Sequence, residues 1–184
     1  TGVMMVDLMV PLCKWQRELI IGDQKIGKSL LLLQSTIAQA REGSVIVYSV
    51  IGRKKSEILG IYNYLKDQGV EKQTIIVATS PMDSPGEIFT GPYTAMSMAE
   101  YFRDQGRDVL VVLDNLSIHA KYYREIALVS KKFPGRNSYP GDIFYIHSRL
   151  LERAGNFMVN GREVSITCLP VAETIQGDLS DYIS

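Results

Sequence analysis

The sequence predicts an α/β fold, a mainly parallel sheet flanked by helices, in a single domain. Apolar runs of strand length alternate with segments of helical periodicity, which is typical of βα units around a parallel sheet. Several of these runs are continuously apolar and β-branched, as strands covered on both faces are. A chain of 184 residues with 46% hydrophobic residues is long enough for one well-packed core.

The expected elements follow from these periodicities. Strands are expected at residues 18–21, 45–51, 74–79, 109–113 and 164–169. Helices are expected at 28–41, 55–68, 93–105 and 143–154, with Gly69 and Gly106 as C′ caps of two of them. Because residues 81–92 and 134–141 are rich in Pro and Gly, we expect long surface loops there.

Composition excludes several classes of protein. The 20 basic and 20 acidic residues balance, so no net field draws the chain to nucleic acid or to an anionic membrane. Cys13 and Cys168 lack metal-ligand spacing and are expected to be buried thiols in a reducing compartment. His119 and His147 are expected at the surface or in helix packing. No apolar run approaches the roughly 20 residues of a membrane span, so we expect a soluble chain.

The main chemical motif is a phosphate-binding loop at residues 22–29, which read GDQKIGKS and match G-x-x-x-x-G-K-[ST] between a strand and a helix. Backbone N–H groups of such a loop wrap phosphate oxygens, and the positive end of the following helix dipole adds to the attraction. Lys28 can reach the β and γ phosphates, and the Ser29 hydroxyl can ligate Mg²⁺. The candidate nucleotide-binding set is Gly22, Asp23, Gln24, Lys25, Ile26, Gly27, Lys28, Ser29 and Leu30.

Asp114 directly follows the expected strand at 109–113. In P-loop proteins an Asp at this place holds Mg²⁺, usually through its water shell. A polar residue at the end of a strand can also begin a turn or cap a helix, and that alternative stays open here. Ser29 and Asp114 are therefore the candidate metal residues.

Long ordered segments resemble the central nucleotide-binding domain of the α subunit of the rotary F-type ATP synthase. They read TGVMMVDLMVP at 1–11, QRELIIGDQKIGKS at 16–29, PYTAMSMAEYFRDQG at 92–106, PGRNSYPGDIFYIHSRLLERA at 134–154 and LPVAETIQGDLSDYI at 169–183. The resemblance implies a RecA-like fold, ATP or ADP with Mg²⁺ as ligand, and a ring in which α subunits alternate with catalytic β-type subunits around a central stalk. It also implies a domain excised from a longer subunit, peripheral on the cytoplasmic face of a membrane or in a mitochondrial matrix or plastid stroma.

Arg53 marks the position that separates catalytic from non-catalytic members. The resemblance implies that β-type relatives carry a water-orienting Glu after the Gly that ends the second strand, and α-type relatives a Gln. Here Gly52 is followed by Arg53, whose guanidinium cannot accept a proton. We therefore expect a site that binds nucleotide without turning it over. Arg53 either contacts the γ phosphate or is a solvated charge beside Lys54 and Lys55.

The chain also departs from the α-type pattern. Cys13, Lys14 and Trp15 stand where the family has Gly-Arg-Gly, and residues 24–26 read QKI in place of Arg-Gln-Thr. These departures suggest a divergent α-like paralogue. Two alternatives to the α-type reading also stay open. One is a catalytic P-loop ATPase of a related ring, such as a secretion-system export ATPase. The other is a scaffold that no longer binds nucleotide.

Overall fold

A computed structural model describes residues 1–133, 135–174 and 176–177, and it confirms the predicted α/β fold. Five parallel strands lie in the order β1-β6-β4-β2-β3, and β5 pairs antiparallel with β6. The strands are β1 Ile20–Gly22, β2 Val45–Val50, β3 Thr74–Ala78, β4 Val109–Asp114, β5 Gly155–Val159 and β6 Arg162–Glu173. The α-helices are α1 Met4–Met9, α2 Lys28–Arg41, α3 Lys55–Asp67, α4 Pro85–Asp104, α5 Leu116–Val129 and α6 Ile143–Leu151, and two 3₁₀ turns are η1 Glu71–Gln73 and η2 Arg136–Ser138.

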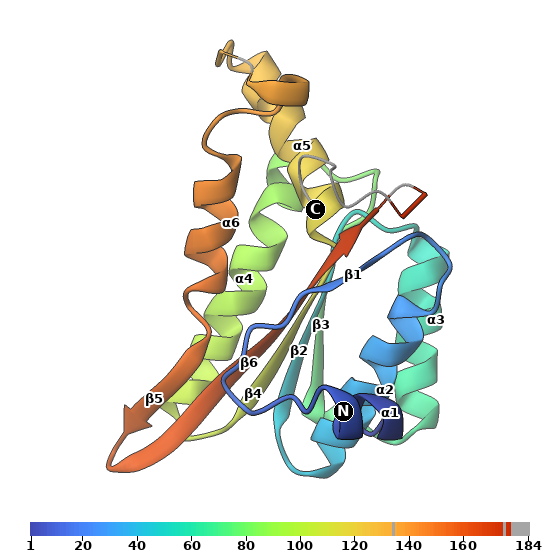
Figure 1. Cartoon of the computed structure of the whole chain (residues 1–184), viewed down its shortest axis with the longest axis vertical. Coiled ribbons are helices and arrows are strands. Elements are labelled where there is room, and N and C mark those ends of the chain that lie inside the picture. The colour runs from blue at the N-terminus through green and yellow to red at the C-terminus, as the bar shows by residue number, and fades with distance from the viewer. Residues whose placement is uncertain (134, 175, 178–184) are drawn as a thin grey trace.

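The two central strands are buried along their whole length because helices cover both faces of the sheet (Figure 1). Successive side chains of a strand point to opposite faces. Val111 and Leu113 therefore pack in the core beneath α4, whereas Leu110 and Val112 pack in the core beneath α2 and α3. The same alternation puts Asp114, the last residue of β4, on the α2 side of the sheet.

The amino-terminal half of α4 lies where the sequence predicts a loop, so the loop prediction for 81–92 is wrong for Pro85 onward. Ser84 and Glu87 form a capping box: the Glu87 N–H donates to Ser84 Oγ at 3.3 Å, and the Ser84 N–H donates to the Glu87 carboxylate at 2.9 Å. Pro85 follows at the first helical position, where a missing N–H costs nothing. These local start signals outweigh the Pro and Gly content.

The other differences concern short or interrupted elements. The sequence analysis missed α1, α5 and β5, and β6 runs from Arg162 to Glu173 rather than over 164–169. In the predicted loop at 134–141, η2 forms, and Tyr139 and Pro140 are buried; residue 134 lies outside the described residues. Gly69 and Gly106 follow their helices with φ of 71° and 79°, so both C′ caps are confirmed. Cys168 is buried as predicted, but Cys13 is exposed.

A histidine pair, the buried His119 and the half-buried His147, joins α5 to α4 and α6. His119 Nε2 lies 3.0 Å from the carbonyl oxygen of Phe89, and His119 Nδ1 lies 3.0 Å from Nε2 of His147. Since a carbonyl only accepts, His119 donates through Nε2 and accepts through Nδ1 from a neutral His147. Burial lowers the pKa of His119 to about 4, and burial together with the charge of His119 lowers the pKa of His147 to about 3.

We predict that this pair makes the fold sensitive to mild acid. Unfolded histidines bind protons below pH about 6.5, whereas the folded pair stays neutral, so the free energy of unfolding falls as pH drops from about 6.5 towards 4. Between pH 7 and 5, His119 should account for about 2 kcal/mol and the less buried His147 for less. Urea unfolding across this range measures the effect. The double variant His119→Gln/His147→Gln should flatten the pH dependence, and an unchanged slope would contradict the assignment.

The capping box predicts a separate loss of stability. Ser84→Ala removes the side-chain acceptor for the Glu87 N–H and should lower the free energy of unfolding by about 1 kcal/mol. Ser56→Ala, an exposed serine inside the first turn of α3, is the matched control and should change it by less than about 0.5 kcal/mol. Equal effects of the two substitutions in urea unfolding would argue against a stabilising capping box.

Candidate functional site

The parallel register brings the carboxyl ends of four strands to one edge of the sheet. Gly22 at the end of β1 pairs with Glu173 at the end of β6, and Val50 at the end of β2 pairs with Asp114 at the end of β4. The loop at 22–29 therefore opens next to the predicted Asp114, as the sequence analysis expects. Ligands of open parallel sheets bind outside the carboxyl ends of the strands.

The loop turns tightly into α2. Gly27 is the N-cap of α2 with φ of 99°, a left-handed conformation that glycine adopts without strain, and its carbonyl oxygen accepts from the N–H groups of Leu30 and Leu31. The first N–H groups of a helix have no acceptor inside the helix. This turn therefore presents backbone donors and the positive end of the α2 dipole to the space in front of it. Ile26, the bulky departure in the motif, stays 62% exposed.

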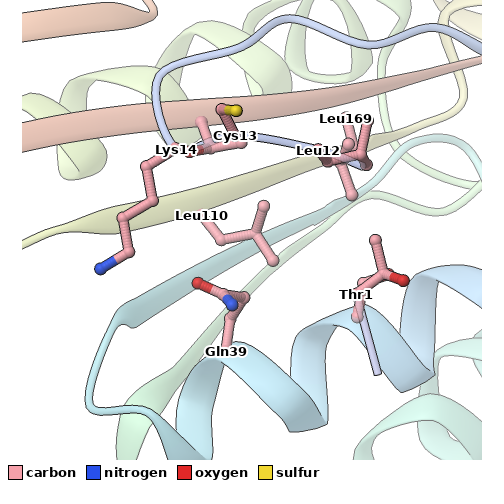
Figure 2. A pocket seen from close by; sticks show the side chains of 9 residues that line it. Thr1, Leu12, Cys13, Lys14, Gln39, Leu110 and Leu169 are labelled. Carbon is pink, nitrogen blue, oxygen red and sulfur yellow. The ribbon is translucent and has the colours of Figure 1, made fainter. Parts of the chain in front are cut away.

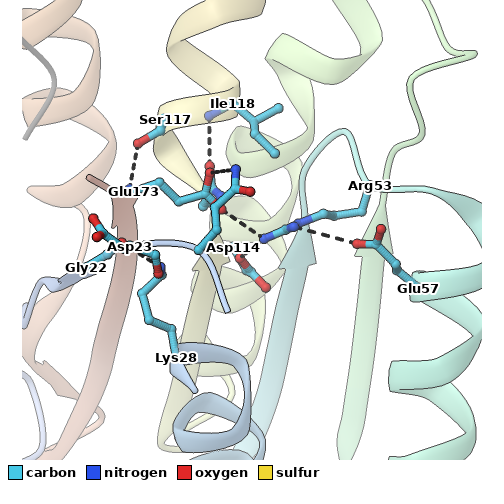
Figure 3. Close-up of polar contacts among 11 residues, drawn as sticks. Gly22, Asp23, Lys28, Arg53, Glu57, Asp114, Ser117, Ile118 and Glu173 are labelled. Atoms are coloured by element: carbon cyan, nitrogen blue, oxygen red, sulfur yellow. Dashed lines mark hydrogen bonds and ion pairs between the residues drawn. The ribbon is translucent and has the colours of Figure 1, made fainter. Parts of the chain in front are cut away.

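Lys28 is held across the loop by the loop itself. Its ammonium group donates to the carbonyl oxygens of Gly22, at 2.6 Å, and Asp23 (Figure 3). An ammonium has three donors, so one remains for a phosphate oxygen beside these two contacts. Carbonyl groups of the loop thus hold the lysine beside it.

The side chain of Asp23 joins the loop to the segment that follows β6. It accepts from the Thr174 hydroxyl and from the N–H of Gly177, and these two bonds, in that order, hold the pKa of the carboxyl below its usual range. The carboxylate is therefore engaged with the segment after β6. Asp23 can meet a phosphate through its backbone, while its negative charge is directed elsewhere.

Arg53 joins three carboxylates from three elements. Its Nη2 lies 3.3 Å from Asp114 and 3.4 Å from Glu173, and its Nη1 lies 3.6 Å from Glu57 (Figure 3). The solvated-charge alternative for Arg53 is therefore wrong, because its side chain is only 26% exposed and ion-paired. Gly52 makes this approach possible: at its φ of 59°, an added Cβ would lie 2.8 Å from the Ile118 side chain.

Burial and charge act in opposite directions on the central pair. Burial is the largest effect on Asp114 and raises the pKa of its carboxyl, against the attraction of Arg53. Burial also opposes the charge on Arg53, but the attraction of Asp114, Glu173 and Glu57 outweighs it and raises the pKa of the guanidinium. The charge of each member thus favours the charged form of the other.

The helix-capping alternative for Asp114 is also wrong. The residue that caps α5 is Asn115, whose side-chain oxygen accepts from the Ile118 N–H at 2.8 Å. Asp114 instead turns to the α2 side, and the peptide between Asp114 and Asn115 is cis. Its carboxylate thus has no capping role and is paired with Arg53 instead.

Two cavities meet at this edge and share Ser29, Arg53 and Glu57. The first, of about 500 Å³, is lined also by Gln24, Lys25, Gly27, Lys28 and Glu173. The second, of about 480 Å³, reaches Asp114 and the apolar side chains of Leu30, Leu33, Ile61 and Tyr64 between α2 and α3. Cavities of this size hold drug-sized ligands. Cationic side chains, backbone donors and an adjoining apolar wall fit a nucleotide, and the Ser29 hydroxyl and Asp114 carboxylate are the oxygen ligands that Mg²⁺ prefers.

Away from this edge, a cavity of about 270 Å³ is lined by Tyr62, Leu65, Glu71, Thr74 and Ile76. A cavity of about 50 Å³ between α2 and the sheet, beside Cys13 and Leu110, has room for only a few water molecules (Figure 2). Within residues 1–133, 135–174 and 176–177 no cluster of three or more His, Cys, Asp or Glu residues has metal-binding geometry. Over the same ranges, no helix has the length and hydropathy to cross a membrane.

Glu173 is the site residue that the sequence analysis missed. It pairs with Arg53, accepts from Gln24 Nε2 at 3.1 Å, and donates through its N–H to Ser117 Oγ at 2.9 Å. An available signal is the apolar run Val171–Ala172 after Pro170, which continues β6 up to this carboxylate. A strand prediction that ends at residue 169 stops short of it.

Comparisons with known proteins identify the family of the chain. The model of the ATP synthase alpha/beta family, nucleotide-binding domain, matches residues 2–184. The chain is 44% identical to ATP synthase subunit alpha 2 of Nitrosospira multiformis over 183 residues and 45% identical to ATP synthase subunit alpha of Pseudomonas fluorescens over 194 aligned residues. It is 44% identical to the same subunit of Carsonella ruddii. All of this chain is covered in each case, but only 36%, 38% and 40% of these relatives.

We predict that Arg53 and Asp114 are energetically coupled. Arg53→Met leaves a buried carboxylate without its cation and should lower the free energy of unfolding by about 3 kcal/mol. Adding Asp114→Asn should restore part of that loss, which gives a coupling free energy of about 1–3 kcal/mol in a double-mutant cycle. Urea unfolding of the four proteins measures it.

Glu57→Gln is the control for that cycle. Glu57 is 48% exposed and its contact with Arg53 is 3.6 Å, so its loss should cost less than about 1 kcal/mol. Strictly additive effects of the Arg53 and Asp114 substitutions would show that the pair does not interact.

Proposed function

The chain belongs to the ATP synthase alpha/beta family, and from this premise we propose that it is an α-type domain whose own site binds ATP or ADP with Mg²⁺ and does not hydrolyse it. The observation that carries the proposal is the side chain after Gly52. Hydrolysis needs a carboxylate that orients and polarises water, and Arg53 supplies a guanidinium at that place.

The described carboxylates near the loop are poor substitutes for a water-orienting base. Glu57 and Glu173 line the first cavity, but both form ion pairs with Arg53. Glu173 also accepts from Gln24. Each of these carboxylates thus lies beside a guanidinium that favours its charged form and draws it towards the cation, which supports binding without turnover.

The proposed binding roles follow from the loop geometry. The backbone of residues 22–27 and the first turn of α2, through Leu30, would surround the phosphates, and Lys28 would contribute its remaining donor. Ser29 and Asp114 would hold Mg²⁺, which supplies charge neutralisation between the phosphates. Arg53 would reach the γ phosphate from the end of β2.

The proposed setting is a ring of alternating α-type and catalytic β-type subunits around a central stalk, peripheral to the membrane on its cytoplasmic face or within an organelle. The names of the relatives support this setting, since each is an ATP synthase subunit alpha. Exposed aromatic side chains also support it: Tyr101 on α4 is 60% exposed, and Phe144 and Tyr145 on α6 are 52% and 62% exposed. In such a ring, bound nucleotide would order the loop and stiffen an interface against which the neighbour moves.

We predict that the chain binds Mg-ATP in calorimetric titration and that Lys28→Ala weakens binding by at least about tenfold, because a charge-assisted contact to phosphate is lost. Lys55→Ala is the matched control. Lys55 opens α3 as Lys28 opens α2, but it is exposed and lies outside both cavities, so binding should not change.

A phosphate-release assay on the same samples tests the second half of the proposal. We expect release no greater than that of Lys28→Ala. Clear turnover would contradict the non-catalytic site and favour a catalytic ring ATPase. A folded chain that binds no nucleotide would favour the scaffold.

A further inference from the structure

Arg53, which follows β2, places a permanent positive charge beside Asp114, the carboxylate that Mg²⁺ would need. Arg53 Nη2 lies 3.3 Å from Asp114 Oδ1, and the Asp114 side chain is only 4% exposed. Glu173 at 3.4 Å and Glu57 at 3.6 Å hold the same guanidinium from two other elements.

We infer that Arg53 is the resident cation of this site, so that the chain binds a nucleoside triphosphate without requiring Mg²⁺. The inference rests on the proposed function, because it concerns the same site. A guanidinium carries five N–H donors in a plane and binds phosphate oxygens in pairs. Arg53 can therefore keep carboxylate partners and still donate to a phosphate. Lys25 and Lys28 line the same cavity and add two more positive charges.

Competition for Asp114 is the second step. If Asp114 is to bind Mg²⁺, Arg53 must give up its contact with this buried carboxylate. Arg53 then also lies beside the positive charge of the metal ion. Arg53 cannot easily turn away, since Glu173 and Glu57 hold it, and Gln24 in turn holds Glu173 at 3.1 Å. We therefore expect Mg²⁺ to raise the affinity for nucleotide only slightly while residue 53 is Arg, and to raise it more when Arg53 is replaced.

Calorimetric titration with ATP, in excess Mg²⁺ and separately in EDTA, tests the inference on the whole chain. The Kd values of the unmodified chain should agree within about threefold in the two buffers, whereas Arg53→Gln should bind at least about tenfold more tightly with Mg²⁺ than in EDTA. Lys54→Gln removes a neighbouring exposed charge and should behave as the unmodified chain does.

A second measurement uses Mg²⁺ alone and needs no nucleotide. Added Mg²⁺ should raise the melting temperature of Arg53→Gln and leave that of the unmodified chain unchanged, because only the variant has a free Asp114. If Arg53→Gln does not fold, Asp114→Asn replaces it: this variant frees Arg53 and should bind ATP in EDTA at least as tightly as the unmodified chain does.

The outcomes separate the two proposals. Binding by the unmodified chain in Mg²⁺ but not in EDTA would overturn the inference and leave the proposed function standing. An equal Mg²⁺ dependence of Arg53→Gln and the unmodified chain would also overturn it. Absence of ATP binding in both buffers would overturn the proposed function and this inference with it.

Discussion

The site depends on the parallel register of β4 between β2 and β6. In that register Asp114 lies opposite Val50, two residues before Gly52 and three before Arg53, and the ladder continues through β6 to Glu173 opposite Gly22. A slip of β4 by one residue would turn Asp114 into the apolar core beneath α4 and bring Leu113 to the α2 side. The two apolar cores resist such a slip, because every residue of β2 and β4 is buried against one helical layer or the other.

Within this frame, groups of the protein itself hold the charges near the loop. Loop carbonyls hold Lys28, three carboxylates hold Arg53, and residues after β6 hold Asp23. Groups fixed in this way lose little side-chain entropy when a polyanion binds, which favours affinity. A carboxylate already paired with a guanidinium has less to offer a metal ion. The arrangement that fixes these charges is thus the same one that, in our inference, reduces the dependence of nucleotide binding on Mg²⁺.

Sequence patterns predicted those parts of the fold and the site that depend on neighbouring residues, and failed where residues far apart in the chain meet. Local signals were reliable: continuous apolar runs located β2 and β4, the motif located the loop, and Gly69 and Gly106 located two helix ends. Composition misled where it was used alone. Pro85 begins a helix and Pro92 lies buried inside it, and Pro170 lies within a strand that continues to Glu173. The exposed Cys13 was mispredicted because residue type is a weak guide to burial at one position.

The part of the site that sequence could not supply is the partnership of Arg53. Asp114 and Glu173 lie 61 and 120 residues further along the chain, and only the strand order places them beside the same guanidinium. Sequence alone therefore left Arg53 open between a phosphate contact and a solvated charge. The strand register excludes a solvated charge. It suggests a third role, in which the Arg53 guanidinium balances the charge of the site's own carboxylates. Under the two proposals above, Arg53 acts on two functions together. It offers no carboxylate to orient water, and its charge competes with Mg²⁺ for Asp114.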